Sequence, residues 1–268
     1  MVADVRAQLR QPKLGEMVAG VIRQRILDGE WRDGQLLPNQ DALVAEFRVS
    51  RPSIREAMRI LEAEGLITVR RGNVGGAVVH RPEARHVAYA MAMVLESRGV
   101  TLDDVGVAMG QLEATSAGLC ASRKDRARKV VPQLRRHNTA AEKAMDDPMA
   151  FVRATSDFHS SLVELCGNDT LRLLAGSLES LWLVDVNSWA ENATRNGSFP
   201  SRAHRLKNHD QHLRITEAIA DGDSAAAMRL TETHFDPARF LRPEDASRRV
   251  DAAAMHALVG SPSVRGSE

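Results

Sequence analysis

Hydroxyl and guanidinium side chains recur along residues 50–59, at a spacing that could bring them to a polyanion. These side chains are Ser50, Arg51, Ser53, Arg55 and Arg59. Arginine can donate to guanine edges in a DNA groove, and the backbone N–H groups that begin a helix favour phosphate. The alternative is an ordinary amphipathic helix with a solvated basic face. The charge pattern alone favours this alternative, because Glu56, Glu62 and Glu64 dilute the positive charge.

The other side of the same segment is apolar. Ile54, Met58 and Leu61 recur at i, i+4 and i+7, which is one stripe of an α-helix. Ser50 stands where an N-cap belongs, and Pro52 falls in the first turn, where a missing N–H costs nothing. The segment is therefore predicted to be a helix that buries one side and presents hydroxyls and arginines at its N-terminal end.

The flanking segments predict the elements that would position this helix. Residues 39–47 read as a short helix with Asn39 as its N-cap, and Arg48-Val49 is a tight connection to the next helix. After Gly65, residues 66–70 are strand-like, residues 71–76 are rich in turn formers, and residues 77–79 can return as a second strand. Together these elements predict a winged helix-turn-helix.

Several motifs in this region resemble the DNA-binding domain of GntR-type bacterial regulators. The matching stretches are Leu37-Pro38, Val49 to Ala57, Leu61 to Ile67, and Arg71-Gly72, and the resemblance covers about residues 14–80. It implies DNA contacts by Ser50, Arg51, Ser53, Arg55, Arg71 and Gly72. The arginines of the helix would read bases or clamp phosphate, the serines would bond phosphate, and the wing would enter the minor groove. One departure is Asp41, where relatives commonly have an arginine that contacts DNA.

Composition places the chain among ordinary two-domain proteins. It has 268 residues and a formal net charge of +1, so the chain as a whole is no polycation. Cys120 and Cys166 form no ligand motif and are expected to be buried, reduced thiols. We expect a cytoplasmic protein, because no apolar run approaches the ~20 residues of a membrane span and no signal peptide is evident.

The remainder of the chain predicts a second, all-helical domain. The winged helix-turn-helix is expected over residues 10–80 and a linker over residues 81–86, because Pro82 disfavours helix at the residue before it. A 3.6-residue apolar period then runs through most of residues 87–242, interrupted by Gly, Pro and Asn breakers. Residues 243–268 are rich in Ala, Ser, Arg and Gly and are predicted to be a disordered tail. The fold class is therefore mainly α, with an N-terminal winged helix-turn-helix and a C-terminal helical bundle.

Three short motifs in the second domain resemble the FCD effector domain of FadR-like regulators. They are Phe158-His159-Ser160-Ser161-Leu162 before Gly167-Asn168, the run from His212 to Gly222-Asp223, and the run from Ala226 to His234. The resemblance implies that His159, His212 and His234 hold a divalent metal such as Zn or Ni, to which neutral imidazoles are suited. The family's aspartate ligand, four residues before the first histidine, is replaced by Thr155. The alternative is a hydrogen-bonded polar pocket without metal.

The same resemblance suggests an effector pocket near Thr155, Met109 and Trp182. Met109 stands where many FCD domains have an arginine that would help to hold an anionic ligand, so a small-carboxylate effector is less strongly implied. Trp182 and Trp189 lie a heptad apart on one helix face, where they could be core residues or could line a cavity.

These inferences predict a ligand-responsive transcription regulator. It is expected to bind a pseudo-palindromic DNA operator as a homodimer and to bind a small-molecule effector in the bundle. The alternatives are a regulator with a metal-free pocket for an organic ligand and a metal-dependent enzyme that uses the three histidines. No catalytic nucleophile motif such as Gly-x-Ser-x-Gly supports the enzyme.

Overall fold

The computed structural model describes residues 13–70, 76–82, 84–234 and 247–254. These residues form two compact units, one that ends at residue 83 and one that begins at residue 84. Each unit has its own apolar core. No helix in the described ranges is both long and apolar enough to cross a membrane.

The described residues of the N-terminal unit form three helices and a two-stranded hairpin. Its helices are α2 (Leu14–Leu27), α3 (Gln40–Phe47) and α4 (Arg51–Ala63). The Oδ1 atom of Asn39 accepts from Ala42 N and caps α3, and the Oγ atom of Ser50 accepts from Ser53 N and caps α4. Between them Arg48 takes φ 53°, a left-handed conformation that ends α3 sharply. The predicted helix-turn-helix is present.

The predicted apolar stripe of α4 forms the centre of this unit. Ile54, Met58 and Leu61 are buried, and they belong to a core that also contains Ile22 of α2 and Leu43 of α3. The hairpin consists of β1 (Ile67–Arg70) and β2 (Gly76–Val79), antiparallel, with Ile67 opposite Val79. The predicted tip of the wing, including Arg71 and Gly72, lies outside the described residues.

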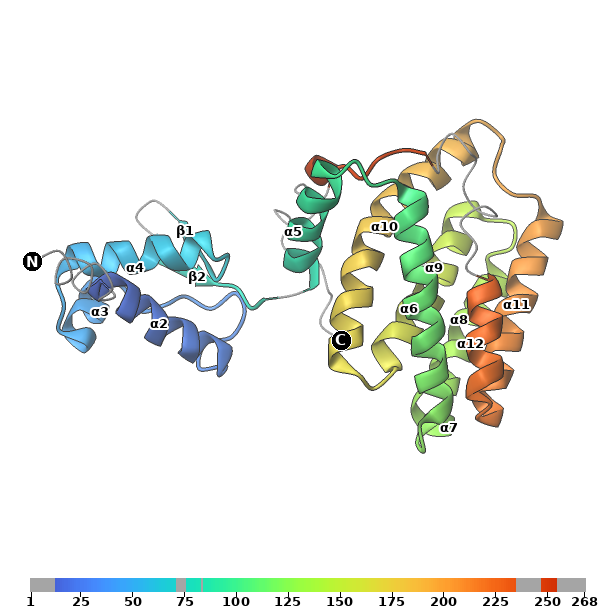
Figure 1. The fold of residues 1–268 in the computed structure, drawn as a ribbon, viewed down its shortest axis with the longest axis horizontal. Helices are drawn as coiled ribbons and strands as arrows, with labels where there is room; N and C mark the ends of the chain where they lie inside the picture. The colour runs from blue at the N-terminus through green and yellow to red at the C-terminus, as the bar shows by residue number, and fades with distance from the viewer. Residues whose placement is uncertain (1–12, 71–75, 83, 235–246, 255–268) are drawn as a thin grey trace, which may run out of the picture. The chain divides into compact units, whose positions relative to one another are not determined.

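The C-terminal unit is a helical bundle. Its helices are α5 (Ala84–Ser97), α6 (Leu102–Ser122), α7 (Arg126–Lys129), α8 (Val131–Lys143), α9 (Pro148–Leu165), α10 (Asp169–Arg195), α11 (Arg202–Asp221) and α12 (Ser224–His234). α6 packs against α9, α10, α11 and α12, and is therefore the helix around which this part of the bundle is arranged (Figure 1). The predicted mainly α fold class is confirmed.

Two boundaries differ from the sequence prediction. α5 begins at Ala84, so the last residues of the expected 81–86 linker are helical. The expectation that all of residues 243–268 are disordered is wrong for residues 247–254. There Leu102 N donates to Arg248 O, Val250 N donates to Val100 O, and the Val250 side chain is buried in the core. Apolar contacts distant in sequence order this segment, and composition alone does not reveal such contacts.

Candidate functional site

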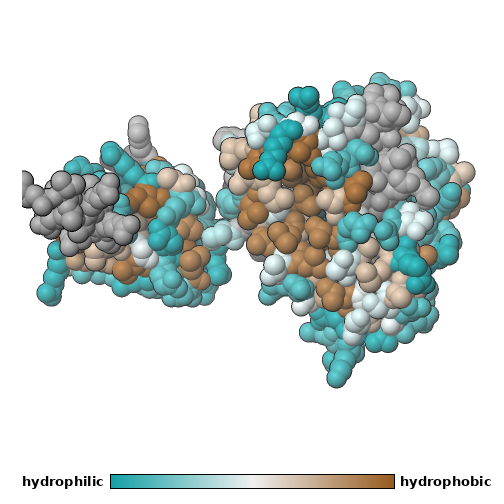
Figure 2. Space-filling view, in the orientation of Figure 1, coloured by the Kyte–Doolittle hydropathy of each residue, from teal (hydrophilic) through white to brown (hydrophobic). Residues whose placement is uncertain are grey.

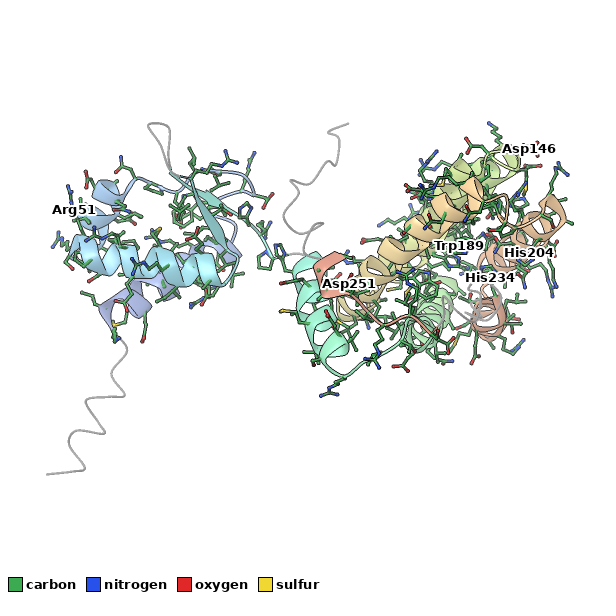
Figure 3. The ribbon with its side chains drawn as sticks, turned by 90° about the horizontal axis from the view of Figure 1, so that it is seen from above. Arg51, Asp146, Trp189, His204, His234 and Asp251 are labelled. Carbon is green, nitrogen blue, oxygen red and sulfur yellow. The ribbon has the colours of Figure 1, made fainter. Side chains whose placement is uncertain are left out.

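Three histidines from three helices meet inside the C-terminal unit. His159 lies on α9, His212 on α11 and His234 on α12, and Figure 3 labels His234. The Nε2 atom of His234 lies 2.9 Å from Nε2 of His212 and 3.3 Å from Nε2 of His159. One ring nitrogen of each residue lies within 4.8 Å of the others. The structure therefore brings together all three histidines that the sequence singled out.

Neighbouring rings hold this arrangement. The Phe158 ring stacks on the His212 ring with 4.1 Å between centroids and 10° between planes. The rings of His159 and His234 are stacked at 5.1 Å. His212 and His234 are fully buried, whereas His159 is only partly buried. The cluster thus has a closed inner side and one more accessible member.

Glu113 of α6 adds a carboxylate that the sequence analysis did not assign to the site. The Nδ1 atom of His159 donates to Glu113 Oε2 over 2.6 Å, and Glu113 is 1 % exposed. Burial lowers the pKa of His159, but the charge of Glu113 and this hydrogen bond outweigh it, so the pKa is raised. The carboxylate therefore stabilises positive charge on the ring of His159. The sequence pattern around Glu113 did not indicate that this carboxylate contacts His159.

His212 has the opposite electrostatic environment. Burial, followed by the neighbouring histidines His234, His159 and His209, keeps its pKa well below the ordinary value. His212 is therefore neutral near pH 7, the protonation state that a metal ligand requires. Its Nδ1 atom has no hydrogen-bond partner within the described residues.

These residues fit a divalent metal. Nitrogens bound at ~2.0–2.1 Å to a tetrahedral ion lie roughly 3.3 Å apart. The distances from Nε2 of His234 to Nε2 of His212 and of His159, 2.9 and 3.3 Å, are close to this value. Because Nδ1 of His159 donates to Glu113, a neutral ring keeps its lone pair on Nε2, the atom that faces the cluster. A carboxylate behind a ligating histidine is a common outer-shell arrangement at metal sites.

Thr155 is placed differently from a ligand. Its hydroxyl donates to the backbone carbonyls of Phe151 and Val152, one turn earlier on α9. The hydroxyl is thus used within the helix, as is usual for threonine at a helical position. The carboxylate nearest the cluster comes from Glu113 on another helix, and it contacts His159 rather than the centre.

A cavity of about 110 Å³ adjoins the histidine cluster. Its lining residues are Phe151, Val152, Thr155, Ser156, His159, Trp182, Val186, Trp189, Phe199, Pro200, His204, Arg205 and Asn208. Two residues of the expected effector pocket, Thr155 and Trp182, belong to this wall. The third, Met109, is buried in the apolar core beside Trp182 and does not line the cavity. His159 belongs both to the cavity wall and to the histidine cluster.

Four of the six expected DNA-binding residues, Ser50, Arg51, Ser53 and Arg55, stand at the N-terminal end of α4, where Figure 3 labels Arg51. The hydroxyls of Ser50 and Ser53 lie 3.0 Å apart. Arg51 forms a 2.9 Å ion pair with Asp41 of α3, and both side chains are exposed. Arg55 lines a groove between α3, α4 and the hairpin, together with Arg59 and Arg70, which were not among the predicted contacts.

Comparison with known proteins agrees with this architecture. Residues 14–78 match the family described as bacterial regulatory proteins, gntR family, and residues 104–237 match the FCD domain. The HTH-type transcriptional repressor NanR of Citrobacter rodentium is 28% identical over 240 residues, covering 85% of each chain. The NanR repressor of Klebsiella aerogenes is 29% identical over 239 residues, covering 86% of this chain and 85% of the relative.

A solved structure shows the same fold. Streptococcus agalactiae GntR superposes with a TM-score of 0.56 at 22% identity, covering 84% of this chain and 98% of that one. The matched families consist of transcription regulators, so the predicted regulator is confirmed and the enzyme alternative is not supported. The chain belongs to the gntR family of bacterial regulatory proteins and carries an FCD domain as its second unit.

Proposed function

We propose that this regulator represses transcription as a homodimer on a pseudo-palindromic operator, in the cytoplasm, and responds to an effector bound beside a divalent metal. The observation that carries the proposal is that His159 both lines the cavity and belongs to the histidine cluster. A ligand in the cavity would therefore act directly on the group that ties α9 to α11 and α12. Repression is favoured by the names of the NanR relatives.

DNA binding would use the exposed end of α4. Ser50, Arg51, Ser53 and Arg55 would enter the major groove, with Arg71 and Gly72 of the wing at the minor groove. The N-terminal end of α4 is the positive end of its helix dipole and favours phosphate. A helix-turn-helix dimer reads two half-sites about one helical turn of DNA, or a multiple of it, apart.

An apolar surface on the C-terminal unit supports the homodimer. Met93 and Val94 of α5 and Val107 of α6 are each about half exposed. Figure 2 shows apolar residues gathered over α5, α10 and the adjoining part of α6. A second copy of the chain would cover this surface, as is usual for soluble regulators with two-fold symmetry.

His159, His212 and His234 would hold the metal, and Glu113 would orient His159. When bound, the ion would supply positive charge and an open coordination position beside the cavity. The second candidate is a metal-free pocket, which the 2.9 Å contact between His212 and His234 favours, because neutral imidazoles can hydrogen-bond to one another. Elemental analysis of protein purified without a His-tag separates the two candidates.

Genome-wide mapping of bound DNA, followed by gel shifts on the mapped sites, tests the regulatory proposal. We expect sites with two inverted half-sites, one complex with two copies of the chain, and loss of binding in the double variant Arg51→Ala, Arg55→Ala. Mapped sites without inverted symmetry, or bound by a single copy, would contradict the homodimer. Full binding by the double variant would contradict the assigned reading helix.

A further inference from the structure

The walls of the cavity restrict the kind of effector that can occupy it. Aromatic side chains dominate them, with Trp182 and Trp189 from α10, Phe151 from α9, and Phe199 before α11. The rings of Trp189 and Phe199 lie 5.8 Å apart and are tilted by 35°. Aromatic walls favour another ring over a flexible aliphatic chain, because ring pairs add energy beyond their buried area.

The size of the cavity limits its occupant to one ring. Its volume of about 110 Å³ is somewhat smaller than the ~150 Å³ engineered cavity that takes up benzene in another protein. A volume of this order holds about one ring between the aromatic walls, and the cavity is partly open to solvent. The exposed side chain of His204 is also part of the wall, so a polar substituent can extend toward solvent there.

The charge of the walls favours an anion. No Asp or Glu is among the described lining residues, whereas Arg205 is. Arg205 Nε donates to Met145 O over 2.8 Å, Nη1 donates to Pro200 O, and the guanidinium lies 5.6 Å from the Phe199 ring centroid. In the described part of the chain no carboxylate pairs with Arg205, so its charge is uncompensated at the cavity wall.

Asn208 supplies an independent observation. It is 8 % exposed and lines the cavity, and its Oδ1 has no hydrogen-bond partner among the described residues. A buried acceptor without a donor is costly, so a ligand hydroxyl that donates to it would be stabilising. Asn208 lies three residues after Arg205 on α11, which places both side chains on one helix face.

We propose that the effector is a hydroxylated monocyclic aromatic acid, with its ring among the tryptophans, its carboxylate on Arg205 and its hydroxyl on Asn208. This inference rests on the proposed effector role of the cavity. It also assigns to Arg205 the anion-binding role that the sequence analysis associated with the position of Met109.

Calorimetric titration of the full-length, tag-free protein tests the inference. The probes are benzoate, its 2-, 3- and 4-hydroxy derivatives, benzyl alcohol and cyclohexanecarboxylate. We expect benzoate to bind about tenfold more tightly than benzyl alcohol, which lacks the charge, and about fivefold more tightly than cyclohexanecarboxylate, which lacks the aromatic ring. At least one hydroxybenzoate should bind more tightly than benzoate, and no preference for benzoate over either analogue would overturn the proposal.

Matched variants locate the binding. Arg205→Gln should weaken benzoate binding about tenfold, while Arg202→Gln, on the same helix but outside the cavity, should not change it. Asn208→Ala should remove the advantage of the hydroxybenzoate. Thermal melts ensure that each variant is folded, and quenching of tryptophan fluorescence by ligand should be reduced in Trp189→Leu, with Trp182 as the remaining tryptophan of the wall.

A gel shift on a mapped operator distinguishes this inference from the proposed function. If the wild-type protein binds its operator but none of the aromatic acids, the ligand class is wrong while the regulatory role stands. If it binds the acids but no operator, the DNA-binding proposal fails instead. Equal binding by wild type and Arg205→Gln would refute the placement of the carboxylate.

Discussion

Glu113 and His159 are joined by a 2.6 Å hydrogen bond between α6 and α9, 46 residues apart in the chain. The bond determines which nitrogen of His159 faces the other two histidines, because Nδ1 is occupied by the carboxylate. It also places a buried negative charge behind a cluster that is otherwise made of imidazoles.

Glu113→Gln should weaken metal binding by roughly 10–100-fold, because outer-shell partners of ligating histidines have effects of this size. The amide keeps the shape of the side chain but removes its charge. Competition with a zinc chelator measures the affinity, and Glu232→Gln on the exposed side of α12 serves as the control. Equal zinc affinity in Glu113→Gln and wild type would show that the carboxylate does not act on the site.

Thr155→Asp should tighten metal retention, because it introduces a carboxylate one helical turn before His159, where it can approach the ion. Thr155→Val is the matched control. It removes a hydroxyl that bonds only to backbone carbonyls in the described structure, so metal retention should stay as in wild type. Metal content after dialysis, and thermal melts with and without chelator, provide the measurement. A loss of metal in Thr155→Val would contradict the assigned role of the hydroxyl.

Truncating a side chain to alanine should have different effects on the exposed side and on the buried side of α4. Arg55→Ala should weaken binding to a mapped operator by ~1–3 kcal/mol and leave folding intact, because Arg55 is exposed. Met58→Ala should cost ~2–5 kcal/mol of unfolding free energy, because Met58 is only 6 % exposed in the core. Chemical denaturation and operator titration of both variants separate the two effects. The reverse outcome, a stable Met58→Ala and an unfolded Arg55→Ala, would invert the assigned sides.

Asp41→Asn should strengthen binding to a fixed, non-operator DNA duplex. Asp41 holds the guanidinium of Arg51 at 2.9 Å and repels phosphate, so its neutralisation frees one cation for the DNA backbone. The slope of log K against log salt should steepen by about one, the change expected for one more neutralised phosphate. Asp28→Asn, at the exposed end of α2, is the control. An unchanged slope would mean that Arg51 already contacts phosphate despite Asp41.

Stability should fall as pH rises from about 4.5 to above 7, because burial raises the pKa of Glu179 to about 7. The unfolded chain ionises this carboxyl at its ordinary pKa, whereas the folded chain resists ionisation. The free energy of unfolding therefore keeps its full value below the pKa of the unfolded chain. It falls by roughly 3 kcal/mol as the pH rises through the pKa of the folded chain. Glu179→Gln should flatten this part of the unfolding profile, while exposed Glu142→Gln should not. A Glu179→Gln profile with wild-type slope would place the pH dependence elsewhere.

Local sequence signals determined most of the elements. The period of Ile54, Met58 and Leu61 predicted the buried side of α4, and Ser50 and Asn39 predicted its cap and that of α3, because capping and amphipathic periodicity act within a few residues. Glycine and proline breakers likewise placed the helices of the second unit. The family resemblance then indicated which histidines to consider together.

The contacts between those elements were decided only by the tertiary structure. Glu113 reaches His159 because α6 packs against α9, and Arg205 enters the cavity wall beside Trp189 because the segment before α11 packs near α10. Val250 is buried although its segment resembles a disordered tail in composition. Periodicity and capping specify which side of a helix is apolar, but the neighbour that covers that side depends on packing of the whole chain. Sequence therefore determined the helices and the candidate ligands, and only packing decided which carboxylate, cation and aromatic rings surround them.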